Sequence, residues 1–129
     1  MDLRDDGMCF ACGPRNPIGL KLDFSFENGR YVTRFTPRPE HQGFVGITHG
    51  GILSTVLDEA MARLVYAQGH RAVTVEMHIR LRKPAPTGEE LTVSGWITSE
   101  TSRAIECAAE ARNPEGELIA EATARMIRV

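Results

Sequence analysis

The chain is short of the features that mark several large classes of protein. It has 15 Lys and Arg residues against 17 Asp and Glu, a formal net charge of -2 at pH 7. Compact nucleic-acid-binding domains are usually basic, so this balance argues against a nucleic-acid partner. No stretch of the sequence approaches the roughly 18 consecutive apolar residues that a membrane span needs. We therefore expect neither a nucleic acid nor a membrane as a partner.

Cysteine is scarce, with Cys9, Cys12 and Cys107 as its positions. An odd number of cysteines argues for free thiols in a reducing compartment rather than for a disulfide framework. The first residues, MDLRDDG, lack the basic and then apolar regions of a secretory signal. Together these features predict a cytoplasmic protein.

The pair Cys9-x-x-Cys12 has the spacing of a zinc knuckle, but a closed zinc site needs four ligands. The chain has no second cysteine pair, although His41 or another histidine could complete a mixed site. A redox role is also disfavoured, because the pair does not open a helix after a strand. We expect no metal and no other cofactor.

Two widespread enzyme motifs are also missing. The chain has no G-x-S-x-G nucleophile elbow, which argues against a serine hydrolase. It has no GxxxxGK[ST] loop either, so an enzyme acting on nucleoside triphosphates is disfavoured.

Hydrophobic periodicity organises most of the chain. With 129 residues we expect a single domain over 1–129, whose residues 1–17 form an irregular lead-in. Alternation of apolar and polar residues predicts strands. They are Leu20–Phe26, Arg30–Thr36, Ala72–Lys83, Glu90–Ser99, Arg103–Arg112 and Glu117–Val129. The alanines of Arg103–Arg112 would also suit a helix, but the turn that follows favours a strand. In Ala72–Lys83 we expect Val73, Val75 and Met77 on one face and Thr74 on the other.

One long helix is predicted to begin near Gly50 and to end at Gln68-Gly69-His70. Its apolar residues recur at i, i+3, i+4 and i+7 over about four turns. The order is then two strands, one helix and four strands. Because one face of an antiparallel sheet must be covered, we expect an α+β fold whose sheet wraps the helix.

The most informative segment runs from His49 through Gly50 and Gly51 to Asp58. Two glycines at a helix start leave backbone N–H groups uncovered, and the partial positive charge there suits a polarised carbonyl oxygen. This arrangement is typical of an oxyanion hole. Asp58 falls near the apolar stripe, where a carboxylate is costly unless it is paired or used.

The segment GFVGITHGGILSTVLDEAM resembles the signature of the hotdog-fold thioesterase superfamily, in its phenylacetate-pathway (PaaI-like) branch. The segments CFACGPRNPIGLKLDF and TVEMHIRLRKPAPTGEEL resemble the same branch. The resemblance implies a hotdog fold, a curved antiparallel sheet wrapped around one long helix. It also implies acyl-CoA thioester hydrolysis at the interface of a homodimer, with a homotetramer made of dimers as the further possibility.

The resemblance also implies residue roles. Asp58 would activate a water or act as the nucleophile, and the N–H of Gly50, with that of Gly51 as an additional donor, would polarise the thioester carbonyl. Thr74 would position the water, and His49 would orient the loop or the carbonyl. A carboxylate base and an oxyanion hole suffice for a thioester, whose thiolate leaves readily.

Other positions have less defined roles. Gln42 stands where relatives often have Asn, and Glu59 is the competing acid on the helix. Adjacent helical side chains point about 100° apart, so one of Asp58 and Glu59 faces the carbonyl, and the spacing favours Asp58. The cluster Arg80, Arg82 and Lys83 would either hold the CoA phosphates or be a solvated strand end.

Two other functions fit the same fold. One is a hydratase or dehydratase acting on enoyl or hydroxyacyl thioesters, whose relatives pair a catalytic His with an acid at a different spacing. The other is a non-catalytic acyl-CoA-binding protein.

Overall fold

The computed structural model of the protein describes residues 1–129. The elements are β1 (Ser25–Glu27), β2 (Arg30–Phe35), the short 3-10 helix η1 (Pro39–His41), α1 (Gly50–Ala67), β3 (Ala72–Leu81), β4 (Leu91–Glu100), β5 (Ala104–Arg112) and β6 (Leu118–Arg128). The predicted order of two strands, one long helix and four strands is confirmed. No helix combines the length and the apolar character that crossing a membrane would require.

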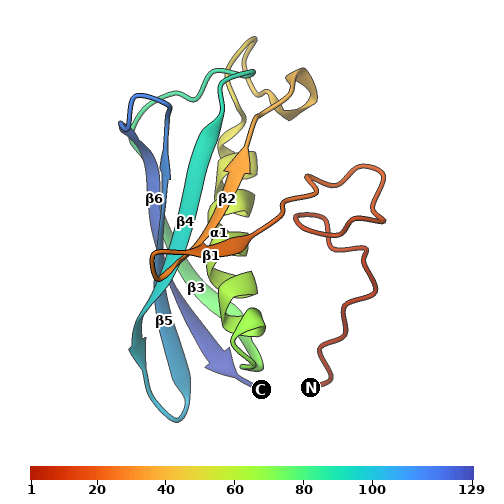
Figure 1. Cartoon of the computed structure of the whole chain (residues 1–129), viewed down its shortest axis with the longest axis vertical. Coiled ribbons are helices and arrows are strands. Elements are labelled where there is room, and N and C mark those ends of the chain that lie inside the picture. The colour runs from red at the N-terminus through yellow and green to blue at the C-terminus, as the bar shows by residue number, and fades with distance from the viewer.

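The six strands form one sheet in the order β1-β2-β4-β5-β6-β3, and all neighbours are antiparallel. The sheet curves around α1, which contacts strands β2 to β6 (Figure 1). This architecture confirms the predicted α+β fold. β1 and β3 are the edge strands, so one side of β3 has no strand partner within the chain.

The core lies between the concave face of the sheet and the apolar stripe of α1. Its helix residues are Leu53, Val56, Leu57, Ala60, Met61, Leu64 and Val65. Gly95 on β4 lets the sheet approach the helix closely, because a Cβ there would lie 2.4 Å from the carbonyl oxygen of Ala60. Any larger residue at Gly95 would push the helix off the sheet.

The predicted strand Leu20–Phe26 is wrong over most of its length, because β1 begins only at Ser25. The N–H of Leu20 donates to the carbonyl of Phe10 (2.9 Å), and that of Leu22 to the carbonyl of Ala11 (2.9 Å). These backbone groups therefore bond the irregular N-terminal segment instead of a strand. That segment lies beside α1, outside the sheet (Figure 1).

The predicted strand at Arg103–Arg112 is confirmed as β5, which buries alternate residues against the helix. The alternation expected in β3 is wrong after Thr74. A β-bulge shifts the pairing with β6 by one residue, so Thr74 pairs with Met126 and Met77 with Ala124, both of which are buried. Thr74 therefore shares the concave face with Met77, and Val75 is 56% exposed.

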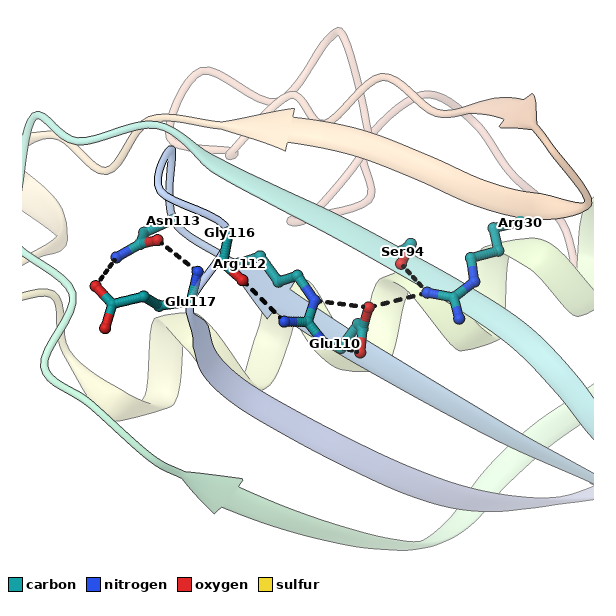
Figure 2. A network of polar contacts seen from close by, with 7 residues as sticks. All are labelled: Arg30, Ser94, Glu110, Arg112, Asn113, Gly116 and Glu117. Atoms are coloured by element: carbon teal, nitrogen blue, oxygen red, sulfur yellow. Dashed lines mark hydrogen bonds and ion pairs between the residues drawn. The ribbon is translucent and has the colours of Figure 1, made fainter.

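A network of ion pairs crosses the outer face of the sheet (Figure 2). The Glu110 carboxylate on β5 accepts hydrogen bonds from Arg30 on β2 (2.9 Å) and from Arg112 (3.0 Å). Arg112 also donates to the carbonyl of Gly116 (2.9 Å), in the turn that leads to β6. The network links β2 to β5 across β4, on the side of the sheet away from the helix.

Candidate active site

The start of α1 is shaped by the side chain of His49, which is the N-cap residue. Its Nδ1 accepts a hydrogen bond from the N–H of Gly51 (2.8 Å), and its carbonyl accepts from Ile52 (3.0 Å) and Leu53 (3.2 Å). The N–H of Gly50 has no hydrogen-bond partner in the chain. Of the two glycine N–H groups considered for an oxyanion hole, the one left free is therefore that of Gly50.

Gly50 lines a cavity of about 280 Å³ between the start of α1 and the end of β3. Its other lining residues include Leu53, Leu81, Arg82 and Lys83. A Cβ on Gly50 would lie 3.0 Å from Cδ1 of Leu81, which places that side chain at the helix start. The cavity thus combines a free N–H, apolar walls and two cations.

The predicted basic cluster is divided by the structure. Arg82 donates to Glu121 (2.8 Å) and Lys83 forms an ion pair with Glu117, so both cations already have exposed carboxylate partners. Arg80 lines a different cavity on the outer face of β3. The structure therefore brings Arg82 and Lys83, but not Arg80, to the cavity of Gly50.

Gln42 is engaged in the loop before the helix. Its Oε1 accepts a hydrogen bond from the N–H of Gly46 (3.1 Å), and its backbone bridges to Thr48. Between these anchors the loop exposes Phe44 (86%) and Val45 (90%). Gln42 thus stabilises a loop that displays two apolar side chains to the surroundings.

Asp58 lies two turns into α1 and faces β3. Oγ1 of Thr74 donates to its carboxylate (3.1 Å), a contact that the bulge in β3 makes possible. The carboxylate is half-buried and has no cationic partner. Burial raises the pKa of Asp58 above its ordinary value, and the hydrogen bond from Thr74 opposes that rise.

Asp58 and Thr74 line a second cavity, of about 600 Å³, between α1, β3 and the N-terminal segment. Glu59 lines it too, but points to a different wall, where its Oε1 lies 3.8 Å from Sγ of Cys9. The two adjacent acids thus diverge as helical geometry requires. The sequence did not predict that Cys9 and Cys12 line this cavity beside Glu59. The spacing of the Cys9-x-x-Cys12 pair was the one signal that these residues could share a site.

Gly50 and Asp58 do not meet within one chain. They are eight residues apart on α1, which is about 12 Å along the helix axis at 1.5 Å per residue. They also line different cavities. A single protomer therefore does not present its free N–H and its carboxylate to the same carbonyl group.

The family model of the Thioesterase superfamily matches residues 45–120, which hold the loop, the helix with Asp58, and strands β3 to β5. The chain belongs to this superfamily. Human acyl-coenzyme A thioesterase 13 is 28% identical to it over 74 residues, 56% of this chain and 53% of the relative. Mouse acyl-coenzyme A thioesterase THEM5 is 32% identical over 57 residues, 44% and 23% of the two chains. The chain spans about half the length of the acyl-coenzyme A thioesterases 13 that it matches, and less of THEM5.

Solved structures of the superfamily share the fold of this thioesterase-superfamily chain. The PaaI protein of the Escherichia coli phenylacetic acid degradation operon has a TM-score of 0.79 at 23% identity, and covers 85% of this chain and 80% of its own. A Streptococcus mutans protein crystallised with acetyl CoA has a TM-score of 0.78 at 23% identity, covering 84% and 88%. The expected hotdog architecture is thereby confirmed.

Proposed function

We propose that this superfamily member hydrolyses acyl-CoA thioesters as a single hotdog domain. The observation that carries the proposal is a pair of groups on α1, the half-buried Asp58 carboxylate, which has no cationic partner, and the N–H of Gly50, which has no acceptor. The names of the curated relatives and the acetyl CoA bound to a structural neighbour support CoA thioesters as the substrate class.

In the proposed reaction Asp58 is a general base. It removes a proton from a water molecule while the water oxygen bonds to the thioester carbonyl carbon. The N–H of Gly50, at the positive end of the helix, stabilises the negative charge on the carbonyl oxygen. The carbon–sulfur bond then breaks, the CoA thiolate leaves and takes up the proton held by Asp58, and the acyl group is released as the free acid. Thr74 holds one carboxylate oxygen, which leaves the other for the water.

The two groups act on one carbonyl only if two protomers build each site. We propose a homodimer, alone or paired into a tetramer, in which Asp58 of one protomer faces Gly50 of its partner. The unpartnered edge of β3 and the exposed side chains of Phe44 and Val45 support this assembly, because free strand edges and apolar loops are usually covered.

Arg82 and Lys83 are the proposed contacts for the CoA phosphates, since they flank the cavity of Gly50. Arg80 lies outside that cavity and would reach only a distal part of the ligand. A cytoplasmic location, where acyl-CoA is made and used, is supported by the three free cysteines.

A complementation experiment tests both the chemistry and the assembly. Gly50→Pro removes the free N–H with little disturbance of the helix, because proline is favoured at the first helical position and His49 is already extended, at φ -59° and ψ 133°. We expect Gly50→Pro and Asp58→Asn each to lose about 100-fold or more in kcat, measured as free thiol released from a panel of acyl-CoAs. Gly50→Ala keeps the N–H and is the matched control, which should retain most of the activity.

Mixing the two inactive variants under subunit exchange should restore activity. Half of randomly paired dimers are mixed and each has one intact site, so the expected rate is about a quarter of that of the wild type. Inactivity of the mixture, with exchange verified, would contradict the shared site. CoA release at the same low rate from wild type and both variants would leave a hydratase or an acyl-CoA-binding protein as the function.

A further inference from the structure

Three side chains that can ligate metals meet beside α1, outside the proposed catalytic groups. The thiols of Cys9 and Cys12 and the carboxylate of Glu59 have ligand atoms that all lie within 4.8 Å of one another. All three residues are half-buried in the wall of the cavity that Asp58 also lines. His41, one of the histidines that could have completed a mixed zinc site, instead accepts a hydrogen bond at Nδ1 from the N–H of Arg38 (2.9 Å).

The loop that carries the two thiols has a fixed, tight conformation. The N–H of Cys12 donates to Sγ of Cys9 (3.4 Å), and the N–H of Gly13 donates to the Cys9 carbonyl (2.8 Å). A Cβ on Gly13 would lie 2.4 Å from the backbone nitrogen of Cys9, so only glycine fits there. Backbone N–H groups aimed at a sulfur stabilise it as a thiolate, the form that binds metals.

The charges of the cluster also point to a cation. Two thiolates and a carboxylate at this separation would repel one another, and the nearby guanidinium of Arg63 is already paired with Asp5 (3.1 Å). A divalent ion among the three groups would offset this repulsion, and it deprotonates a coordinating thiol outright.

We propose that Cys9, Cys12 and Glu59 bind a zinc ion, with the fourth tetrahedral position open to the cavity. Two thiolates and one carboxylate form a donor set that zinc accepts. The ion would fasten the irregular N-terminal segment to α1, across 50 residues of sequence, and so fix one wall of the cavity beside Asp58. This site replaces the sequence-based expectation that the protein holds no metal.

Cobalt(II) titration of the full chain tests the site, because a cobalt–thiolate bond gives an intense charge-transfer absorption. Protein stripped by a chelator and kept under reductant should bind one Co²⁺ per chain with this band, and Zn²⁺ should displace it. Cys12→Ser and Glu59→Gln should each weaken Co²⁺ affinity by at least about 100-fold. That is more than the loss expected for a residue that only hydrogen-bonds to a metal ligand. Cys107→Ala is the matched thiol control, since Cys107 is buried in β5, and its affinity should equal that of the wild type.

Thermal unfolding gives a second, independent readout. Zn²⁺ should raise the Tm of the wild type and of Cys107→Ala but not that of Cys12→Ser, because a ligand of the folded state stabilises it. No charge-transfer band in the wild type would overturn the proposal, and so would undiminished affinity in Glu59→Gln. A disulfide between Cys9 and Cys12 in the reductant-treated, metal-free protein would also overturn it. These measurements need no substrate, so their failure is distinct from a failure of the proposed hydrolysis.

Discussion

Asp58 and Glu110 are both half-buried carboxylates, yet they lie on opposite sides of the sheet in opposite surroundings. Glu110, on the outer face, accepts hydrogen bonds from two guanidinium groups, those of Arg30 and Arg112 (Figure 2). Asp58, on the concave face, is bonded to the hydroxyl of Thr74 alone. Hydrogen bonds from Arg112 lower the pKa of Glu110, whereas burial raises that of Asp58.

The difference distinguishes an acid suited to a structural role from one suited to the proposed role of base. A carboxylate neutralised by arginines is a poor base, because its negative charge is already shared. A carboxylate buried without a cation costs stability and keeps its basicity, a combination typical of functional sites. Substitution of each acid by its amide should therefore have opposite consequences for activity and for stability.

The largest expected effect is on turnover. Asp58→Asn preserves size but removes the charge, so kcat for acyl-CoA hydrolysis should fall by about 100-fold or more with little change in KM. Glu110→Gln should leave kcat within about twofold of the wild type, because it lies on the other side of the sheet. Glu59→Gln should cost far less than Asp58→Asn. If Glu59→Gln were inactive and Asp58→Asn active, the role of base would pass to Glu59.

A smaller loss is expected when the one partner of Asp58 is removed. Thr74→Val keeps the shape of the side chain but deletes the hydroxyl that holds the carboxylate. We expect kcat to fall by about tenfold at nearly constant KM, since the carboxylate is misoriented while the binding surface is kept. Thr74→Ser should restore most of the activity. Loss of activity in Thr74→Ser as well would mean that packing by the methyl group, rather than the hydrogen bond, is what matters.

The sequence was sufficient for the structural features that depend on local spacing. Helical periodicity located α1, and the distance from His49 to Asp58 identified the two ends of the proposed site. The contact between Asp58 and Thr74 rests on a β-bulge, and strict alternation placed Thr74 on the wrong face. A bulge adds one residue to a strand without a local sequence signal, so periodicity alone does not reveal it.

Contacts between residues far apart in the sequence were the second feature that periodicity did not predict. Leu20, Leu22 and Phe24 alternate with polar residues as a strand would. The N–H groups of Leu20 and Leu22 instead donate to the N-terminal segment, and Phe24 lies just before β1 begins. The pairing of Glu59 with the thiol of Cys9 joins residues 50 positions apart. Neither contact follows from a pattern within a window of a few residues, because both depend on how the segment folds back on α1.

The next expected effect is on stability. Glu110→Gln should lower the free energy of unfolding by about 1 kcal/mol, a modest value because its arginine partners are 45% and 43% exposed and screened by solvent. The corresponding drop in Tm is about 3–5 °C. Because the folded-state pKa of Glu110 is lowered, its contribution is present above the ordinary glutamate pKa and is lost as the pH falls through the lowered value. Thermal melts of the two proteins should therefore differ at neutral pH and converge in acid.

The smallest expected effect has the opposite sign. Asp58→Asn should raise Tm by about 1–3 °C at neutral pH, because it removes a charge that is buried without a cation. The folded-state pKa of Asp58 is raised, so the ionised group destabilises the fold above that pKa and ceases to do so below the ordinary aspartate pKa. The Tm of Asp58→Asn should accordingly exceed that of the wild type by less as the pH falls. The Tm of Glu110→Gln, which lies below that of the wild type, should also approach it in acid. Melts with a chelator present keep any bound metal out of the comparison. A lower Tm for Asp58→Asn at neutral pH would show that this carboxylate is stabilised in the fold, and the contrast between the two acids would fail.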